Sequence, residues 1–222
     1  MSFVRQSFTP QAVILLHGIF RTNRSMRKLE RMLTKQGYTV FNITYPSTKM
    51  SLEALTEWLH ERIQHLGADM YSHVHMIGYS MGGLLTRAYI HRYNPAWLGR
   101  VVLLAPPNKG SEIADAVKNW WIYKKLYGPA GQQLITNQEQ INPILGEVNY
   151  ELGVIAGTRS IDPLMSCFLP KPHDGKVSVE STKLVGMKAH VTVPVSHTFF
   201  PQSRRVISLT LHFLQKGCFD IP

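Results

Sequence analysis

The chain has 222 residues, of which 44% are hydrophobic and 17% charged, and 24 Lys and Arg against 14 Asp and Glu give a formal net charge of +10. The length is that of one ordinary domain, and the apolar content excludes a disordered chain. Two cysteines, Cys167 and Cys218, exclude a disulfide framework and a four-cysteine zinc site. The longest apolar runs are far shorter than the roughly 18 residues that span a bilayer, and no signal-peptide pattern follows Met1. A cytoplasmic protein is therefore expected.

Short hydrophobic runs alternate along the chain with longer amphipathic stretches, which is typical of repeated βα units and a parallel sheet. Most of these runs are almost continuously apolar, as in strands that are covered by helices on both faces. The pattern predicts six strands, at residues 12–16, 39–44, 73–77, 100–104, 152–156 and 190–195. We therefore predict an α/β protein with a three-layer αβα fold, doubly wound around a mainly parallel six-stranded sheet.

Apolar residues at three- and four-residue spacing predict helices between these strands. One helix follows Ser51, a candidate N-cap, and ends before Gly67. An earlier apolar stripe ends before Gly37, and the last helix is predicted at residues 203–215, closed by Gly217.

Two stretches depart from this alternation. Residues 115–150 are too long for a simple crossover, so we expect helices inserted over one edge of the sheet. Residues 159–172 contain three prolines and are predicted to be a loop. Neither stretch resembles a separate domain. We therefore predict that residues 1–222 form a single domain with a helical insertion at about 115–150.

The strongest motif is Gly-Tyr-Ser-Met-Gly at residues 78–82, which matches the pattern G-x-S-x-G. A predicted strand precedes it and a helical pattern follows it. Such a tight strand-to-helix turn holds its serine in a strained conformation, with the hydroxyl above the carboxyl end of the strand. Glycine is needed on both sides of Ser80 because a Cβ would clash where strand, turn and helix meet. Ser80 is therefore the candidate nucleophile.

A serine hydroxyl needs a base to take its proton, and ten histidines compete for that role. His60, His65 and His91 lie in helix patterns. His197 instead follows the last predicted strand, and functional groups of open α/β sheets gather at the carboxyl ends of strands. We therefore expect His197 to reach Ser80 and act as its base.

The imidazole in turn needs an acid that fixes its tautomer and stabilises the imidazolium. Asp162 and Asp174 both follow the fifth predicted strand. Asp174 is favoured because Asp174-Gly175 is a turn former that would hold a carboxylate in a fixed place. Asp162 is the alternative.

Backbone N–H groups should receive the oxyanion that forms when a carbonyl is attacked. One donor is expected to be Met81, which follows the nucleophile at a helix N-terminus. The second should come from the turn after the first strand, where Gly18 lets the chain approach the serine. Ile19 is the preferred donor in that turn, and Phe20 is the alternative.

Together these residues resemble the α/β-hydrolase superfamily, and within it the compact bacterial lipases and esterases. The points of similarity are residues 17–18, the elbow at 78–83, the segment 106–111, the acid loop 174–177 and the histidine loop 196–197. The chain order Ser80, Asp174, His197 is also that of the superfamily. The resemblance implies a serine carboxylic-ester hydrolase that forms an acyl-enzyme and uses no cofactor and no metal. The two N-terminal strands of larger members are absent here, and no carboxylate cluster marks the structural calcium site of some lipases.

The same scaffold carries other chemistries, so alternatives stay open. A thioesterase or an acyltransferase would use the same triad. A non-catalytic hydrolase-fold protein would instead bind a partner through the Trp-rich insertion, although the complete triad argues against this alternative.

Aromatic side chains interleave with lysines at residues 119–127. One interpretation is a helix that packs on the core and exposes a basic face. The other is a cap over Ser80 in which Trp120 and Trp121, together with Phe20, form an acyl pocket, because aromatics beside lysines suit an interfacial surface.

The positive charge raises the question of a nucleic-acid partner, but no RNP-like, zinc-finger or helix-turn-helix pattern accompanies it, so none is predicted. Six cations gather at residues 21–35, which we interpret as a solvated helix face, with an anionic membrane or an acidic substrate as the alternative. The expected partner is a small-molecule or lipid ester substrate, and transient contact with an anionic membrane is a further hypothesis.

Overall fold

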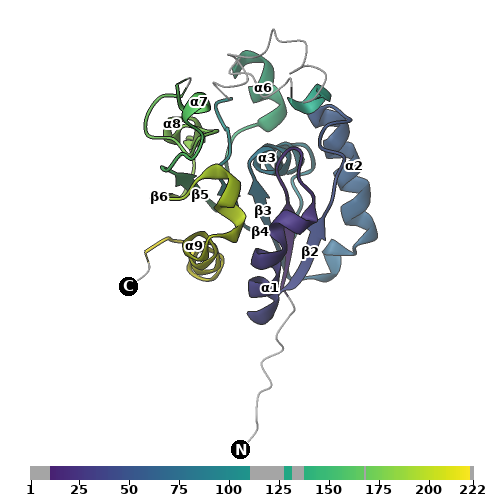
Figure 1. Ribbon diagram of the computed structural model, residues 1–222. Helices are drawn as coiled ribbons and strands as arrows, with labels where there is room; N and C mark the ends of the chain where they lie inside the picture. Colours follow the sequence, from purple (N-terminus) through teal and green to yellow (C-terminus); the bar gives the residue numbers. More distant parts are fainter. Residues whose placement is uncertain (1–10, 111–127, 132–137, 168, 221–222) are drawn as a thin grey trace, which may run out of the picture.

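The computed structural model describes residues 11–110, 128–131, 138–167 and 169–220 (Figure 1). Within them, six strands form one sheet in the order β2-β1-β3-β4-β5-β6, and every pairing is parallel. The strands are β1 (Gln11–Leu16), β2 (Thr39–Ile43), β3 (His73–Tyr79), β4 (Leu98–Leu104), β5 (Leu152–Gly157) and β6 (Ala189–Val193). All six predicted strands are present, so the predicted six-stranded sheet is confirmed and is parallel throughout.

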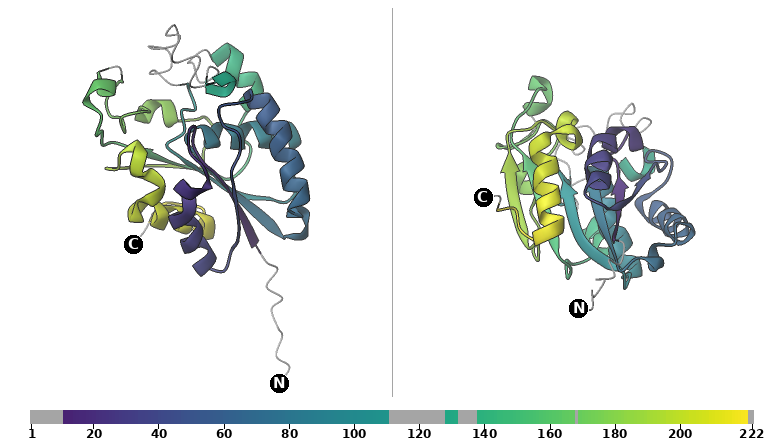
Figure 2. Two further views of the ribbon diagram at one scale, coloured as in Figure 1. Left: turned by 45° about the vertical axis from the view of Figure 1, so that its right-hand side comes forward. Right: turned by 90° about the horizontal axis from the view of Figure 1, so that it is seen from below.

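Helices cover both faces of this sheet (Figure 2). The longer helices are α1 (Arg27–Lys35), α2 (Leu52–His65), α3 (Met81–Tyr93), α6 (Gln138–Leu145) and α9 (Arg204–Lys216). Short helical turns lie between them: η1 (Asn23–Met26), η2 (Ala68–Met70), α7 (Pro163–Ser166), α8 (Val179–Thr182) and η3 (His197–Gln202). The helices α1 and α9 pack on one face, and α2, α3 and α6 pack on the other. The predicted three-layer αβα fold is therefore confirmed.

Strand β1 shows why two helical layers are needed. Its side chains alternate between the faces, and all but the first residue are fully buried. Val13 and Leu15 join the core under α1 and α9, whereas Ile14 and Leu16 join the core under α2 and α3. A strand that is apolar on both faces has to be covered on both faces.

The predicted helix ends are also confirmed. The Ser51 hydroxyl accepts a hydrogen bond from the Ala54 N–H (3.3 Å) at the start of α2, and the Ser203 hydroxyl caps α9 in the same way. Helix α9 ends at Gly217, whose φ of +74° is left-handed and strains residues that have a Cβ.

The stretch 159–172 is not entirely a loop, because it contains the single helical turn α7. Pro163 occupies the first position of this turn, where its fixed φ suits a helix and its missing N–H is not needed. The Ser166 N–H closes the turn on the Asp162 carbonyl (3.1 Å). Of the predicted insertion at about 115–150, residues 115–127 and 132–137 lie outside the described residues, and α6 lies within them. The single-domain arrangement stays a prediction.

The order of the strands determines where the site forms. Strand β3 lies in the middle of the sheet, between β1 and β4, and all six strands point the same way. The turns after β1, β3, β5 and β6 therefore meet at one edge of the sheet. This edge is where ligands bind in open α/β sheets.

Candidate active site

Ser80 lies at the turn between β3, which ends at Tyr79, and α3, which begins at Met81. Its φ of 53° and ψ of −122° are strained for a residue with a side chain. The backbone is fixed in this conformation, because the Ser80 N–H donates to the Leu104 carbonyl of β4 (2.9 Å). The turn thus presents the hydroxyl at the carboxyl end of β3, as the motif predicts.

Glycines allow this turn to form. A Cβ on Gly78 would lie 2.5 Å from the Gly82 carbonyl oxygen, and a Cβ on Gly82 would meet the Leu16 and His17 carbonyls at the end of β1. Backbone atoms cannot move away as a flexible side chain can. The two glycines are therefore required by the close approach of strand, turn and helix.

His197 and Asp174 complete a hydrogen-bonded relay with Ser80. His197 Nε2 lies 3.0 Å from Ser80 Oγ, and His197 Nδ1 lies 2.7 Å from Asp174 Oδ2. The carboxylate can only accept, so Nδ1 carries the proton and Nε2 is left to accept from the serine hydroxyl. This tautomer is the one that a general base toward Ser80 needs.

The acid loop holds Asp174 firmly. Asp174 is 2% exposed, and its Oδ1 accepts hydrogen bonds from the N–H groups of Lys176 (2.9 Å) and Val177 (2.8 Å). The His197 N–H donates to the Asp174 carbonyl (3.0 Å), so backbone and side chain both join the two residues. Asp162, the alternative acid, instead lies 3.3 Å from the Lys176 ammonium. The structure brings Asp174, and not Asp162, against His197.

Tyr79 contributes a contact that the sequence does not predict. Its hydroxyl donates to the His197 carbonyl (2.7 Å), and its ring lies 5.2 Å from the imidazole. Burial raises the pKa of Tyr79, and the nearby Asp174 carboxylate raises this pKa further, so the phenol stays a neutral donor. Tyr79 is the first variable position of the motif, where the pattern itself gives no signal.

His17 is fully buried and stacks on Tyr45, with ring centroids 4.3 Å apart. Its Nδ1 lies 2.8 Å from the Gly18 carbonyl oxygen, which can only accept, so Nδ1 carries the proton. Its Nε2 then accepts from the Tyr45 N–H (3.3 Å). Burial lowers the pKa of His17, which favours the neutral ring. The sequence indicates residues 17–18 through the glycine, and it carries no signal for this role of the imidazole.

The same contacts orient the peptide between Gly18 and Ile19. The Gly18 carbonyl also accepts from the Arg21 N–H (3.2 Å), so it is held from two sides. In a trans peptide the N–H points opposite to the carbonyl, and the Ile19 N–H is therefore directed away from the His17 ring. A Cβ on Gly18 would lie 3.2 Å from Ser80 Cβ, which shows how closely this turn approaches the serine.

The structure describes only one of the three predicted pocket residues. Phe20 has a φ of 59° and is 50% exposed, so its side chain reaches the surface beside the site. Trp120 and Trp121 lie outside the described residues. An open hollow of about 320 Å³ is lined by His197 and by neighbours that include Ile161 and Thr198.

The segment after β4 is hydrogen-bonded to α8, the helical turn that follows the acid loop. The Asn108 amide donates to the Thr182 carbonyl (2.8 Å), and the Lys109 N–H donates to the Ser181 carbonyl (3.0 Å). Asn108 in turn accepts from the buried Arg87 guanidinium of α3 (3.3 Å). These bonds connect α3, which begins beside Ser80, to α8, which follows Asp174.

The described part of the chain holds no group of three His, Cys, Asp or Glu side chains that could bind a metal ion. Cys167 and Cys218 are both free thiols. Within the same described ranges, no helix is both long enough and apolar enough to span a bilayer.

A family model described as palmitoyl protein thioesterase matches residues 12–141, which is more than half of the chain. The matched part contains the turn after β1, the elbow around Ser80 and the segment after β4. No curated protein matches the sequence.

Several solved structures are similar to this chain. The mature form of the lipase BlEst2 from Bacillus licheniformis is 18% identical, with a TM-score of 0.73 over 93% of this chain and 92% of that chain. The phospholipase PlaB from Legionella pneumophila is 16% identical, with a TM-score of 0.73 over 94% of this chain and 60% of that chain. The meta-cleavage product hydrolase CumD from Pseudomonas fluorescens is 17% identical, with a TM-score of 0.62 over 94% and 92%. At these identities the likeness shows the fold, which is that of a minimal α/β-hydrolase.

Proposed function

The chain belongs to the palmitoyl protein thioesterase family, and we propose that it is a serine hydrolase that cleaves carboxylic esters through an acyl-enzyme intermediate. The observation that carries this proposal is the continuous hydrogen-bonded relay from Asp174 Oδ2 through the imidazole to Ser80 Oγ. Its two hydrogen bonds have donor–acceptor distances of 2.7 and 3.0 Å. A serine on a strained elbow with a base and an oriented acid is an activated nucleophile.

In the first half of the reaction, Ser80 Oγ attacks the acyl carbon while its proton moves to His197 Nε2. Asp174 stabilises the imidazolium that forms. The carbonyl oxygen becomes an oxyanion, which accepts hydrogen bonds from the N–H groups of Met81 and Ile19. When the carbonyl re-forms, the bond to the leaving oxygen breaks, and His197 Nε2 gives its proton to the departing alcohol.

In the second half, water takes the place of the alcohol. Its oxygen attacks the acyl carbon of the ester on Ser80 while His197 Nε2 accepts one of its protons. Collapse of the second oxyanion breaks the bond to Ser80 Oγ, which regains the proton from His197. The carboxylic acid leaves, and the relay returns to its starting state without any cofactor.

Substitution of the triad tests the assignment of roles. Ser80→Ala should abolish turnover of p-nitrophenyl esters and labelling by a fluorophosphonate, with an unchanged circular dichroism spectrum. Asp174→Asn should lower kcat by about 10⁴, because the amide favours the wrong imidazole tautomer. Asp162→Asn is the matched control and should keep nearly full kcat. Turnover by the folded Ser80→Ala protein would contradict the proposal, and the reverse order of the two aspartate variants would reassign the acid.

A thioesterase activity is the second candidate, and the family match favours it. Thioester and ester with the same acyl chain would give the same acyl-enzyme on Ser80. They differ in the leaving group, because a thiolate leaves with less help from the protonated His197 than an alkoxide does. Turnover of acyl-coenzyme A and of the matching p-nitrophenyl ester distinguishes the two activities. Equal steady-state kcat values with a burst of product would show that both substrates share a slow deacylation step.

A further inference from the structure

The positive charge of the protein is concentrated in one segment. Residues 21–35 contain six Lys and Arg and one acidic residue, which gives +5 (6 − 1), or half of the chain's net charge of +10. The acidic residue, Glu30, is half-buried, and its carboxylate accepts a hydrogen bond from the Asn42 amide (2.7 Å). The one carboxylate of this segment is therefore engaged at the edge of the sheet.

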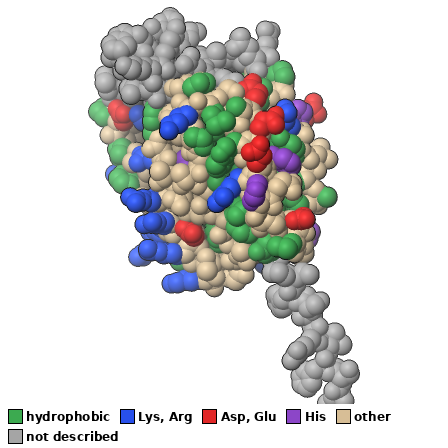
Figure 3. Space-filling model, turned by 90° about the vertical axis from the view of Figure 1, so that its right-hand side faces the viewer, with side chains coloured by type: hydrophobic (Ala, Val, Ile, Leu, Met, Phe, Trp, Pro, Cys, Tyr) green, Lys and Arg blue, Asp and Glu red, His purple; other side chains and the backbone are tan. Residues whose placement is uncertain are grey.

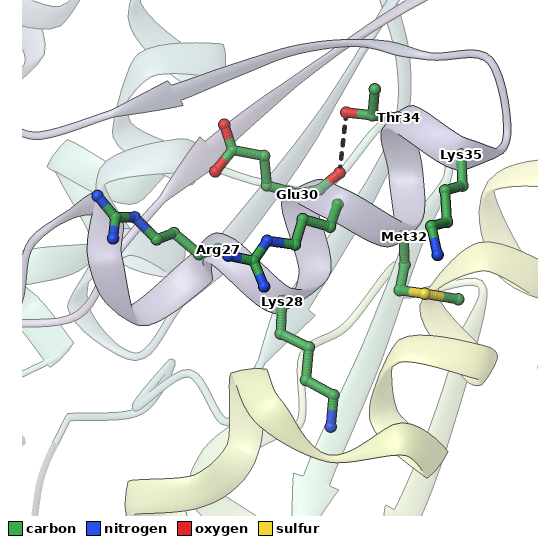
Figure 4. Close-up of a pocket in the computed structure, with 7 residues that line it drawn as sticks. Arg27, Lys28, Glu30, Met32, Thr34 and Lys35 are labelled. Carbon is green, nitrogen blue, oxygen red and sulfur yellow. Dashed lines mark hydrogen bonds between the residues drawn. The ribbon is translucent and has the colours of Figure 1, made fainter.

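Helix α1 separates its apolar and basic residues. Leu29 and Leu33 are fully buried against the sheet, whereas its cations are exposed: Arg27, Lys28, Arg31 and Lys35. Figure 4 shows the labelled side chains extending from the helix in different directions. The shallow hollow drawn there is lined by seven residues of α1 alone, so it is space between side chains and not a ligand cavity.

Helix α9 extends this surface. It packs on the same face of the sheet as α1 (Figure 2), and the Lys28 ammonium donates to the Gln202 carbonyl (2.7 Å) just before α9 begins. Arg204, Arg205 and Lys216 of α9 are exposed. We define the α1–α9 basic surface by its eight exposed cations: Arg24, Arg27, Lys28, Arg31, Lys35, Arg204, Arg205 and Lys216.

Several cations elsewhere on the protein pair with carboxylates. Among the residues that the structure describes, none of these eight cations forms an ion pair. The ion pairs that are present use other cations: Arg92, Arg100, Lys109, Lys176, Lys183 and Lys188. Figure 3 shows the same contrast, with Lys and Arg stacked along one edge and both charge signs mixed on the face that carries α2. The basic surface is thus a concentration of cations without carboxylate partners.

We propose that the α1–α9 basic surface binds the anionic surface of a lipid bilayer. Each Lys or Arg near such a surface strengthens binding, and eight cations without carboxylate partners suit a broad negative surface. A site for single-stranded nucleic acid would combine cations with exposed aromatic rings that stack on bases. The only Phe, Tyr or Trp of α1 and α9 is Phe213, which is fully buried. The exposed rings of Phe20 and Phe199 lie in adjoining turns, and neither helix that carries the cations offers an exposed Phe, Tyr or Trp ring for bases to stack on.

Apolar residues near the active site support a lipid partner. Phe20 is 50% exposed and Phe199 is 53% exposed, and they lie in the turns that carry Gly18 and His197. Both turns adjoin the basic surface, because η1 leads into α1 and η3 leads into α9. Cations beside exposed apolar side chains are typical of surfaces that lie on a membrane. Docking there would hold the rim of the active site at the lipid boundary.

Vesicle cosedimentation of the full chain tests this proposal. The probes are phosphatidylcholine vesicles with and without one third phosphatidylglycerol, at low and high salt. The test variant is Arg27→Gln, Arg31→Gln and Lys35→Gln together, which spares Lys28 because of its bond to Gln202. The control variant changes three exposed cations elsewhere: Lys49→Gln, Arg62→Gln and Arg159→Gln. Both triple variants have the same net charge and should keep the parent circular dichroism spectrum.

We expect binding to the anionic vesicles only, weakened by salt and reduced about 100-fold by the test variant, since each cation contributes about fivefold. The control variant should bind within a fewfold of the parent protein. Equal loss in both variants, or equal binding to the two vesicle types, would overturn the proposal. Binding to single-stranded RNA that needs the same cations, without vesicle binding, would overturn it in favour of nucleic acid. Ser80→Ala should bind vesicles normally, so this result is independent of the proposed catalysis.

Discussion

His17 offers the sharpest test of how this active site is built. Its Nδ1–H is one of two donors that hold the Gly18 carbonyl, and through that peptide it directs the Ile19 N–H. We therefore expect His17 to act as a positioning residue for the oxyanion donor, without touching the substrate. The perturbation is His17→Leu, which fills the site with an apolar side chain of similar size and removes both ring nitrogens.

The expected loss of kcat follows from the contacts that remain in the variant. Removal of an oxyanion donor outright costs about 10²–10³ in kcat. In His17→Leu the Arg21 N–H still holds the Gly18 carbonyl (3.2 Å), so the peptide is loosened but not released. We expect kcat to fall about 10- to 100-fold with little change in KM. The free energy of unfolding should fall by about 2 kcal/mol, because the buried Tyr45 N–H loses its acceptor.

The assay separates positioning from general destabilisation. Hydrolysis of a short soluble ester gives kcat and KM. The affinity of a trifluoromethyl ketone, which the serine converts to an oxyanion adduct, reports on stabilisation of the oxyanion without the later steps of turnover. His17→Asn should restore much of kcat, since its amide N–H can reach the Gly18 carbonyl. Tyr45→Phe keeps the stacked ring and removes the hydroxyl that donates to the His17 carbonyl (2.5 Å), so it should lower stability more than kcat. A His17→Leu protein with reduced stability but unchanged kcat and ketone affinity would refute this role.

Three further predictions concern other residues. Tyr79→Phe should lower the free energy of unfolding by about 1–2 kcal/mol and lower kcat several-fold, because the His197 carbonyl loses its buried donor; an unchanged kcat would show that the loop holds His197 without it. Burial lowers the pKa of His75 from 6.5 to about 4, so the unfolded chain binds a proton between these values while the folded chain does not. The free energy of unfolding should therefore fall by about 3 kcal/mol as the pH falls from 6.5 to 4. In urea unfolding, His75→Gln should show a smaller decline over this pH range, and an equal decline would count against this assignment. If the segment at 119–127 is a cap over Ser80, Trp121→Ala should lower turnover of long acyl esters more than of acetates, whereas equal losses would favour the core-packing interpretation.

The sequence was sufficient to predict the strands and the three side chains of the relay. Ser80, Asp174 and His197 each follow a strand, and a parallel sheet brings the carboxyl ends of its strands to one edge. Chemical type and position along the chain therefore indicated which residues meet. The choice of Asp174 over Asp162 followed from the Asp-Gly turn, and the structure shows two backbone N–H groups on its carboxylate.

The contacts around the relay could not be predicted in the same way. The stacking of His17 on Tyr45 depends on β1 pairing with β2 in a register that aligns Leu16 with Ile43. Neither residue carries a local pattern that indicates the other, and 28 positions separate them. The helical turn α7 differs from the predicted loop for the opposite reason, because its local signal is ambiguous. Proline breaks a helix interior, but it is favoured at the first helical position, which Pro163 occupies here.

The relay is held by its backbone as much as by its side chains. The Ser80 N–H donates to Leu104 in the neighbouring strand, and the His197 N–H donates to the Asp174 carbonyl. The Asp174 N–H donates to the Val177 carbonyl, which closes the acid loop on itself. Strand pairing thus positions the nucleophile, whereas the acid and histidine loops position each other. Because each side chain starts from a fixed backbone, little reorganisation is needed when charge develops, and this preorganisation is what electrostatic catalysis requires.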